Sequence, residues 1–348
     1  CPSEVDLAKL KAEVTHEHHQ RHGSSLRDKL FANIDALNAL GSKLAPLSNW
    51  AAKVPGARLL MEKTVGIARD RSLPTFHRES LVDWFDARGG AQVSEDEAER
   101  RVLLFPDSYT TYNAPGAGKA AVRVLEAANV HVEIPDDVTG SGRPPFSKGF
   151  LDLAREQAAT NVDALAPRVR DGWDVVVVEP SDAVMFQSDY LDLLSGDSEE
   201  RRSSSNRTVS GDDVETVAAN SYGIMEYVDA HRLDEAMAFD APAETLTYHG
   251  HCHQKSTRKD HHAVGVLRRA GYGVDPLDSG CCGMAGSFGY EAEHFSMSTA
   301  IGSILFDQVD ESDGDRVVAP GASCRTQLGD HYDEKPPTPV EALAEALA

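Results

Sequence analysis

Thr245-Leu-Thr-Tyr-His-Gly-His-Cys252 is a short apolar strand pattern that runs into a loop ending in a cysteine. Arg101-Val-Leu-Leu-Phe-Pro-Asp-Ser108 has the same form in the first half of the chain. In both halves, short apolar strands alternate with amphipathic helices, which is typical of parallel strands covered on both faces. We therefore predict an α/β fold with parallel sheets.

The alternation extends along most of the chain after residue 100. The predicted strands cover residues 101–105, 130–134, 175–178, 245–249, 272–274 and 316–319. The predicted helices cover residues 119–129, 151–169, 214–238, 263–270 and 291–308. Each strand is thus followed by a helix or a loop, as βαβ connections require.

The two halves form a repeat. Ser108 corresponds to Cys252, Gly140 and Ser141 to Cys281 and Cys282, and Asp182 to Cys324. The intervals between these positions are 32 and 29 residues, and then 41 and 42 residues. A duplication that produced two βαβ-type units explains this agreement.

Four regions are expected from these patterns. Residues 1–100 are a helical region, because leucines such as Leu26, Leu30 and Leu37 recur at helical spacing. Residues 101–194 are the first unit, and residues 243–348 are the second. Residues 195–242 are a linker and helix, because residues 195–206 contain no apolar side chain.

The net charge argues against nucleic acid as a partner. Lys and Arg number 34 and Asp and Glu number 56, so the net charge is −22 and nucleic-acid binding is not expected. Such a surface suits a salt-rich (halophilic) cytoplasm, where ions screen the self-repulsion. No apolar run has membrane-spanning length, the chain does not begin like a signal peptide, and only five cysteines occur. We expect a cytoplasmic protein, or one peripheral on the inner face of the membrane.

Four cysteines of the second unit carry the clearest chemical signal. Cys252, Cys281, Cys282 and Cys324 each follow a predicted strand, so they belong to loops at the carboxyl edge of one parallel sheet. Thiolates are soft ligands, and four of them suit an iron–sulfur cluster or tetrahedral zinc. We predict a metal site there.

Other interpretations of these residues stay open. The cysteines are alternatively small buried side chains, a disulfide pair, or a nucleophile with His251 or His253 as its base. His251 and His253 are expected to pack in the loop rather than to contact a cluster. Arg325 is placed to offset cluster charge or to meet an anionic substrate or quinone. Glu179 and Arg143 are interpreted as contacts between the units.

The cysteine motifs resemble a known family. His249-Gly-His-Cys-His-Gln254, Gly280-Cys-Cys-Gly-Met-Ala-Gly-Ser-Phe-Gly-Tyr290 and Ser323-Cys-Arg-Thr-Gln327 are similar to the duplicated cysteine-rich (CCG) domain. That domain occurs in iron–sulfur parts of FAD-linked dehydrogenases for D-lactate, glycolate or D-2-hydroxyglutarate. It also occurs in the C subunit of anaerobic glycerol-3-phosphate dehydrogenase and in heterodisulfide reductase.

The resemblance implies an oxidoreductase that passes electrons from flavin to quinone or another carrier. It places FAD and a ferredoxin-like module on an upstream domain or a partner, so that this chain alone has no dehydrogenase activity. Cys1-Pro2 resembles the end of a ferredoxin-like cluster motif, which makes Cys1 a further cluster ligand. The alternatives are a zinc-stapled docking domain and a thiol enzyme like heterodisulfide reductase.

The chain also departs from the family pattern. Ser108, Gly140, Ser141 and Asp182 stand where the first unit of the family carries cysteines, so that unit is expected to bind no cluster and to cover the second site. Gln327 replaces the second cysteine of the final C-x-x-C motif. Four remaining thiols suit a [4Fe–4S] cubane, or zinc, better than a cluster that needs five.

Overall fold

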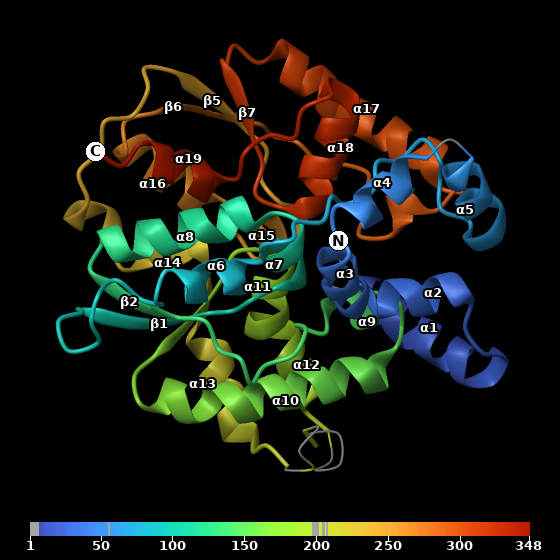
Figure 1. Cartoon of the computed structure of the whole chain (residues 1–348), viewed down its shortest axis with the longest axis horizontal. Coiled ribbons are helices and arrows are strands. Elements are labelled where there is room, and N and C mark those ends of the chain that lie inside the picture. Colours follow the sequence, from blue (N-terminus) through green and yellow to red (C-terminus); the bar gives the residue numbers. More distant parts are fainter. Residues whose placement is uncertain (1–6, 55, 197–201, 204–205, 207) are drawn as a thin grey trace.

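A computed structural model describes residues 7–54, 56–196, 202–203, 206 and 208–348 (Figure 1). Cys1 and part of the polar segment at residues 195–206 lie outside these ranges, so their predicted roles stay predictions. The helical region expected before residue 100 contains α1 (Leu7–His22), α2 (Leu26–Ala32), α3 (Ile34–Lys43), α4 (Leu47–Lys53), α5 (Ala57–Val65) and α6 (Leu81–Ala87).

The first sheet has four parallel strands in the order β2-β1-β3-β4. These strands are β1 (Arg100–Leu104), β2 (Val130–Glu133), β3 (Asp174–Val177) and β4 (Ser221–Gly223). The helices of this part are α7 (Ser108–Tyr112), α8 (Pro115–Ala127), α9 (Arg143–Ser147), α10 (Leu151–Arg170), α11 (Pro180–Val184), α12 (Tyr190–Leu193), α13 (Gly211–Ala219) and α14 (Ile224–Ala230).

The second sheet has three parallel strands in the order β6-β5-β7. These strands are β5 (Thr245–Tyr248), β6 (Gly273–Pro276) and β7 (Arg316–Val318). The helices are α15 (Cys252–Ser256), α16 (His261–Arg269), α17 (Phe295–Glu311), α18 (Ala322–Tyr332) and α19 (Pro339–Glu345). The α/β class with parallel sheets is confirmed.

The strand order supports the duplication. In each unit the first strand of the unit lies in the middle, with the second on one side and the third on the other: β2-β1-β3 and β6-β5-β7. β4 has no counterpart in the second sheet; it pairs with β3 through Val176 and Tyr222. The sequence pattern predicts only helix there, because a strand of three residues is too short to give a period-2 pattern.

A hydrophobic core lies between the two sheets. Alternate residues of a strand point to opposite faces, so Val102 and Leu104 of β1 enter this shared core, whereas Leu103 enters a separate core beneath α10. Leu246 and Tyr248 of β5 reach the shared core from the other sheet. Helices α8, α14, α16 and α19 fill the layer between the sheets (Figure 1). Burial of both strand faces explains the continuous apolar runs.

A buried arginine, Arg71, is among the contacts that join the N-terminal helical region to the second unit. Only 2% of the Arg71 surface is exposed. Its guanidinium donates to the Gly289 carbonyl at 2.9 Å and to Gln327 Oε1 at 2.6 Å. It also donates to Asp330 Oδ2 at 2.8 Å and to Ser298 Oγ at 3.1 Å. This side chain therefore holds α17 and α18 against the segment that follows α5.

Among the described residues, no helix is both long enough and apolar enough to cross a bilayer.

Replacing Arg71 tests this junction. We expect Arg71→Met to lower the free energy of unfolding by about 3 kcal/mol, because Asp330 and Gln327 lose a buried partner. Arg69→Met is the matched control; its ion pairs with Glu62 and Asp70 lie at the surface, so its effect stays within about 0.5 kcal/mol. Urea unfolding followed by circular dichroism measures both. Equal effects of the two substitutions would contradict the role of Arg71.

Candidate metal centre

The carboxyl edge of the second sheet carries all four cysteines of the described part of the chain. Cys252 is the first residue of α15 after β5, and Cys281 and Cys282 lie in the loop after β6. Cys324 lies in the first turn of α18 after β7. Because the three strands are parallel, their connecting segments leave the sheet at the same edge.

The thiols contact one another there. The Cys282 thiol hydrogen-bonds with the thiols of Cys281 and Cys324, and Cys252 lies close enough to Cys281 for their charges to interact. All four are free thiols. Cys282 and Cys324 are buried, whereas Cys252 and Cys281 reach the solvent, so the group has a closed side and an open side.

The environment keeps two of these thiols protonated. Desolvation raises the pKa of Cys252, and the neighbouring Cys281 raises it further. The hydrogen bond with Cys282, together with burial, raises the pKa of Cys281. Nucleophilic cysteines instead have a lowered pKa, so the pKa shifts of Cys252 and Cys281 run opposite to that of an activated thiol.

Gly283 brings the cysteine loop close to α17. Its φ is +91°, and a Cβ atom there would lie 2.2 Å from the Ser298 carbonyl oxygen. The Gly283 N–H donates to Cys281 Sγ at 3.3 Å. Glycine at this position therefore permits both the left-handed turn and an N–H group directed at sulfur.

The two histidines that flank Cys252 differ from each other in burial. His251 is buried, its Nδ1 accepts the His253 N–H at 3.3 Å, and its ring packs on the backbone of Gly321, where a Cβ would lie 2.3 Å away. His253 is half-buried. The packed-loop interpretation therefore holds for His251.

His249 and Lys255 both contact Ser279, in the loop that precedes Cys281. His249 Nδ1 lies 2.6 Å from Ser279 Oγ, and Lys255 Nζ donates to the Ser279 carbonyl at 2.5 Å. Burial, aided by the Lys255 ammonium, lowers the pKa of His249 to about 4. His249 is therefore neutral near pH 7 and fixes the loop that precedes Cys281.

Arg325 and Gln327 have structural roles. Arg325 Nε donates to the Pro336 carbonyl at 2.7 Å, and the guanidinium pairs with Glu341 at 3.4 Å. The structure therefore gives its charge a protein partner in Glu341. Gln327 Nε2 donates to the Ser298 carbonyl at 3.0 Å while Oε1 accepts from Arg71. Gln327, at the position of the missing fifth cysteine, thus links α17 to α18.

The first unit places hydroxyl and carboxyl groups at the equivalent positions. Ser108 begins α7 as Cys252 begins α15, and Asp182 is the third residue of α11 as Cys324 is of α18. Ser141 Oγ donates to Asp182 Oδ1 at 2.5 Å. Burial, together with the charge of Asp107, raises the pKa of Asp182. This edge therefore offers no thiolate.

Glu179 joins the two edges, as expected. The Ala322 N–H at the start of α18 donates to Glu179 Oε2 at 2.9 Å. Burial, strengthened by the charge of Asp182, raises the pKa of Glu179 to about 7. Arg143 binds the Ser181 carbonyl and Asp189 inside the first unit, and its charge also acts on His251 of the second unit.

A cavity of about 570 Å³ lies where the first unit, the second unit and the N-terminal helices meet. Ser108, Ser141 and Asp182 form part of its wall, and Ser323 and Thr326 of α18 form another part. Helices α2 and α3 contribute a third part, which includes Phe31 and Asn38. The sequence does not predict this cavity, because residues 26–65 carry no motif that ties them to the two edges.

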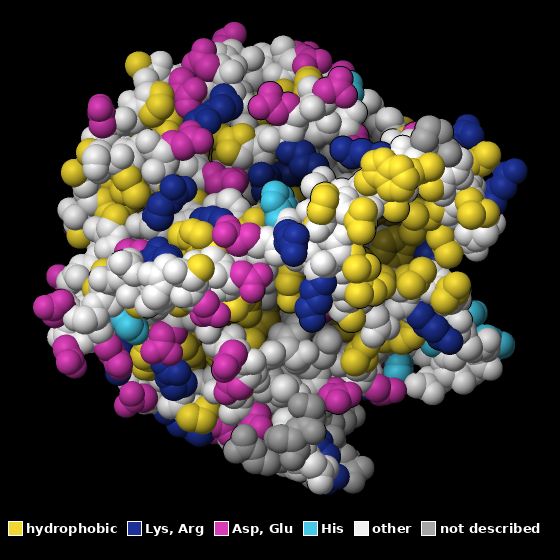
Figure 2. Space-filling model, viewed as in Figure 1, with side chains coloured by type: hydrophobic (Ala, Val, Ile, Leu, Met, Phe, Trp, Pro, Cys, Tyr) yellow, Lys and Arg dark blue, Asp and Glu magenta, His cyan; other side chains and the backbone are white. Residues whose placement is uncertain are grey.

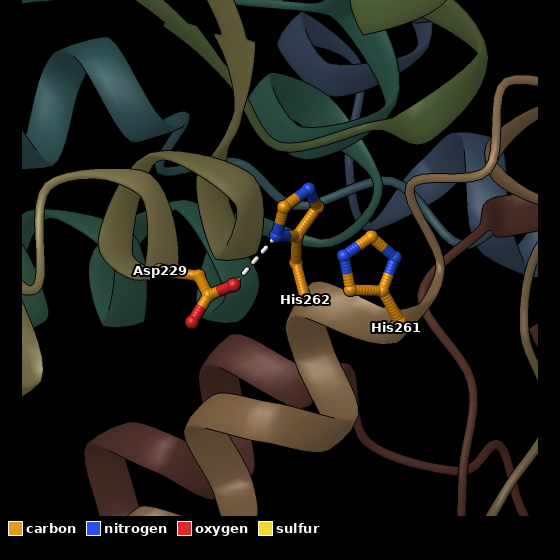
Figure 3. Close-up of side chains that lie close together, drawn as sticks. All are labelled: Asp229, His261 and His262. Atoms are coloured by element: carbon orange, nitrogen blue, oxygen red, sulfur yellow. Dashed lines mark hydrogen bonds and ion pairs between the residues drawn. The ribbon is translucent and has the colours of Figure 1, made fainter.

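A second group with metal-ligand chemistry lies away from this edge. Asp229 of α14 and His261 and His262 of α16 come together in Figure 3. His262 Nδ1 lies 2.7 Å from Asp229 Oδ2, and Arg269 binds the other carboxylate oxygen at 2.5 Å. Since both oxygens of Asp229 are already bound, the group serves as a contact between α14 and α16.

Comparison with known proteins agrees with this geometry. Residues 246–329, which contain all four cysteines, match the CCG cysteine-rich domain. The chain carries a CCG cysteine-rich domain. The resemblance inferred from the cysteine motifs is thereby confirmed, and the domain covers β5 to most of α18.

Three relatives extend the similarity beyond the CCG domain. The C subunit of anaerobic glycerol-3-phosphate dehydrogenase of Escherichia coli is 27% identical over 93% of this chain and 78% of its own length. D-2-hydroxyglutarate dehydrogenase of E. coli is 24% identical over the whole chain, which spans 33% of that protein. Lactate utilization protein A of Shouchella clausii is 22% identical over 71% of this chain and 98% of its own length. The chain is homologous to dehydrogenases and to their subunits.

The two glycines beside the CCG cysteines give a matched test. Gly283→Ala is expected to lower the free energy of unfolding by about 2 kcal/mol or more, because of its positive φ and its contact with Ser298. Gly280→Ala meets open space and is expected to change it by no more than about 0.5 kcal/mol. Urea unfolding of the metal-free protein measures both. A harmless Gly283→Ala would show that the loop adopts another conformation.

Proposed function

We propose that this chain is the iron–sulfur electron-transfer portion of an FAD-linked D-2-hydroxyacid dehydrogenase of the D-lactate or glycolate type. The observation that carries the proposal is the convergence of four free thiols at one sheet edge in a homologue of dehydrogenases. Flavin belongs to a partner domain or subunit, together with a ferredoxin-like module to which Cys1 contributes. Electrons leave to a quinone or another carrier.

The residues fit a cluster of the [4Fe–4S] type. Four soft ligands of one kind lie at one sheet edge, and the open side at Cys252 and Cys281 gives access for loading. Zinc is the alternative occupant of a four-thiol site. A bound cluster supplies one-electron redox chemistry, and the protein tunes it by burial and by N–H groups such as that of Gly283.

Metal analysis tests the proposal. Protein purified without oxygen in high salt, as the net charge of −22 suggests, is expected to contain about four irons and four sulfides. Cys282→Ser removes the thiol that contacts two others and is expected to lose most of that content, with the loss of visible absorbance and of the EPR signal. Ser141→Ala, at the equivalent position of the first unit, is expected to keep it.

The outcomes separate the candidate functions. If the protein is colourless and contains one zinc per chain, the zinc alternative holds. The CCG domain would then be a zinc-stabilised domain that binds the flavin partner. Full iron and sulfide in Cys282→Ser would overturn the assignment of the ligands. One cysteine that alkylates much faster than the others, in metal-free wild-type protein, would support the thiol enzyme. Far-UV circular dichroism shows whether each variant is folded.

We place the chain at the inner face of a membrane, from which a quinone would be reached. Residues 26–69 contain seven Lys or Arg and three Asp or Glu, in contrast to the acidic chain as a whole. On α4 and α5, Leu47, Trp50 and Leu60 are 69%, 70% and 63% exposed. Basic residues with exposed leucine and tryptophan are typical of surfaces that bind anionic lipid.

Vesicle sedimentation tests the membrane surface. Vesicles of phosphatidylglycerol and phosphatidylcholine are expected to bind the protein, and Leu47→Ser with Trp50→Ser is expected to lower the bound fraction at least about fivefold, since apolar burial is lost. Ile304→Ser, which changes a side chain 62% exposed on α17, is the matched control and should bind like wild type. The alternative is that this surface binds a second copy of the chain. In that case the wild-type protein would be a dimer, and the double substitution would convert it to a monomer without changing vesicle binding.

A further inference from the structure

A second cavity, of about 480 Å³, lies between the N-terminal helices and α18. One wall is formed by α4, the start of α5 and the segment after α5, and the other by the end of α18 and the residues that follow it. Its charged lining residues are Lys53, Arg58, Arg69, Asp70, Arg71, Asp330, Asp333 and Lys335. Five basic side chains thus line this basic cleft with three acidic ones, whereas the whole chain has a net charge of −22.

Two of the five basic side chains have carboxylate partners. Arg71 Nη1 lies 2.8 Å from Asp330 Oδ2. Arg69 Nε lies 3.8 Å from Asp70 Oδ2 and 4.0 Å from Glu62 Oε2, which is not part of the lining. In the described part of the chain, no carboxylate oxygen lies within 4.0 Å of the other three, which are Lys53, Arg58 and Lys335.

Arg58 and Lys335 hold positive charge on different walls of the basic cleft. Arg58 donates to backbone carbonyls, among them that of Ala68 at 2.9 Å, and these acceptors are neutral. The alkyl chain of Lys335 packs beside Gly329, where a Cβ would lie 2.6 Å from it. Although Lys335 is exposed as a residue, desolvation of its ammonium, together with the charge of Arg325, lowers the pKa of Lys335. An anion between the walls would offset both charges.

The basic cleft therefore suits an anion with several oxygen atoms. Asp333, the remaining acid of the lining, is exposed and offsets no more than one of the three basic side chains without an ion pair. Lys and Arg only donate hydrogen bonds, and both bind phosphate oxygens. Because the oxygens of a phosphate group point in tetrahedral directions, donors from both walls can contact one such group.

The basic cleft adjoins the exposed apolar surface of the N-terminal helices. Asn49 and Lys53 of α4 line the cleft, whereas Leu47 and Trp50 of the same helix are exposed to solvent. Figure 2 shows Lys and Arg side chains next to the hydrophobic side chains that lie over α4. An anionic lipid combines the two kinds of group that these surfaces bind, a phosphate and apolar chains.

We propose that the basic cleft binds a phosphate group, with Lys53 and Arg58 on one wall and Lys335 on the other. Its place beside Leu47 and Trp50 favours the head group of an anionic lipid, rather than a free phosphate compound, as the source. The bound phosphate then connects the N-terminal helices to the segment after α18. The lipid source rests on the proposed membrane surface, whereas the binding of phosphate does not.

Calorimetric titration with dibutanoyl phosphatidylglycerol, a lipid too short to form bilayers, tests the site directly. Wild-type protein, in buffer free of phosphate and sulfate, is expected to bind one equivalent. Lys53→Gln with Lys335→Gln is expected to weaken binding at least about tenfold, because two hydrogen bonds from charged donors are lost. Lys335→Arg keeps the charge and is expected to keep binding, which a role of Lys335 in packing alone would not predict.

A control pair removes the same charge outside the basic cleft. Lys43→Gln with Lys63→Gln changes exposed side chains of α3 and α5 that do not line it, and should bind like wild type. Equal losses in the two double variants would show general attraction between charges and would overturn the site. Unchanged binding in Lys53→Gln with Lys335→Gln would overturn it as well. Far-UV circular dichroism shows whether each variant is folded.

Inorganic phosphate identifies the source of the phosphate group. It is expected to bind at least about tenfold more weakly than the short-chain lipid, because it lacks the glycerol and acyl groups that reach the apolar surface. Phosphate that binds as tightly as the lipid, and is lost in Lys53→Gln with Lys335→Gln, would keep the phosphate site and overturn the lipid as its source.

Vesicles separate this site from the proposed membrane surface. Leu47→Ser with Trp50→Ser is expected to lose vesicles of phosphatidylglycerol and phosphatidylcholine but to keep the binding of inorganic phosphate. Short-chain lipid that binds wild-type protein in the absence of vesicle binding would keep the basic cleft and remove the membrane location. Vesicle binding without saturable binding of either soluble probe would overturn the phosphate site and leave the membrane location standing.

Discussion

The hydrogen bond from the Ala322 N–H to Glu179 joins the carboxyl edges of the two parallel sheets. Each sheet directs its βα loops toward that edge, so the thiols and their counterparts in the first unit both face this junction. The shared core fixes the relation between the sheets, because Val102 and Leu104 from one and Leu246 and Tyr248 from the other are buried in the same apolar layer. The grouping of the cysteines and the cavity both follow from this arrangement.

The duplication has produced two different kinds of polar edge. The second unit keeps thiols, which contact each other and suit a soft metal. The first unit has Ser108, Ser141 and Asp182 in the same backbone positions, and Ser141 and Asp182 satisfy each other by a hydrogen bond instead. The left-handed glycines Gly142 and Gly283, with φ of +86° and +91°, persist in both units. The two units thus have the same backbone conformation at this edge but differ in the chemistry of their side chains.

Much of this could be predicted from the sequence, because the strands are short, apolar and followed closely by the cysteines. The pattern Thr245 to Cys252 contains both the strand and the loop that leaves it, so the edge that holds Cys252 follows from local information. β4 and the cavity could not be found in this way. β4 is too short to show a period, and Asn38 meets Ser108 only through contacts 70 residues apart, which no local pattern encodes.

Gln327 connects the segment after the N-terminal helices to the helix that carries Cys324. Its side chain is held by Arg71, which belongs to the segment after the N-terminal helices, and it lies one turn from Cys324 on α18. A force or a binding event that displaces those helices therefore acts on the same helix that presents a thiol. Where occupancy at Cys324 and the attachment of the N-terminal helices are coupled through α18, thermodynamic reciprocity makes each strengthen the other by the same free energy. The N-terminal region, which lies outside the CCG domain, is thus connected to the helix that carries one of the thiols.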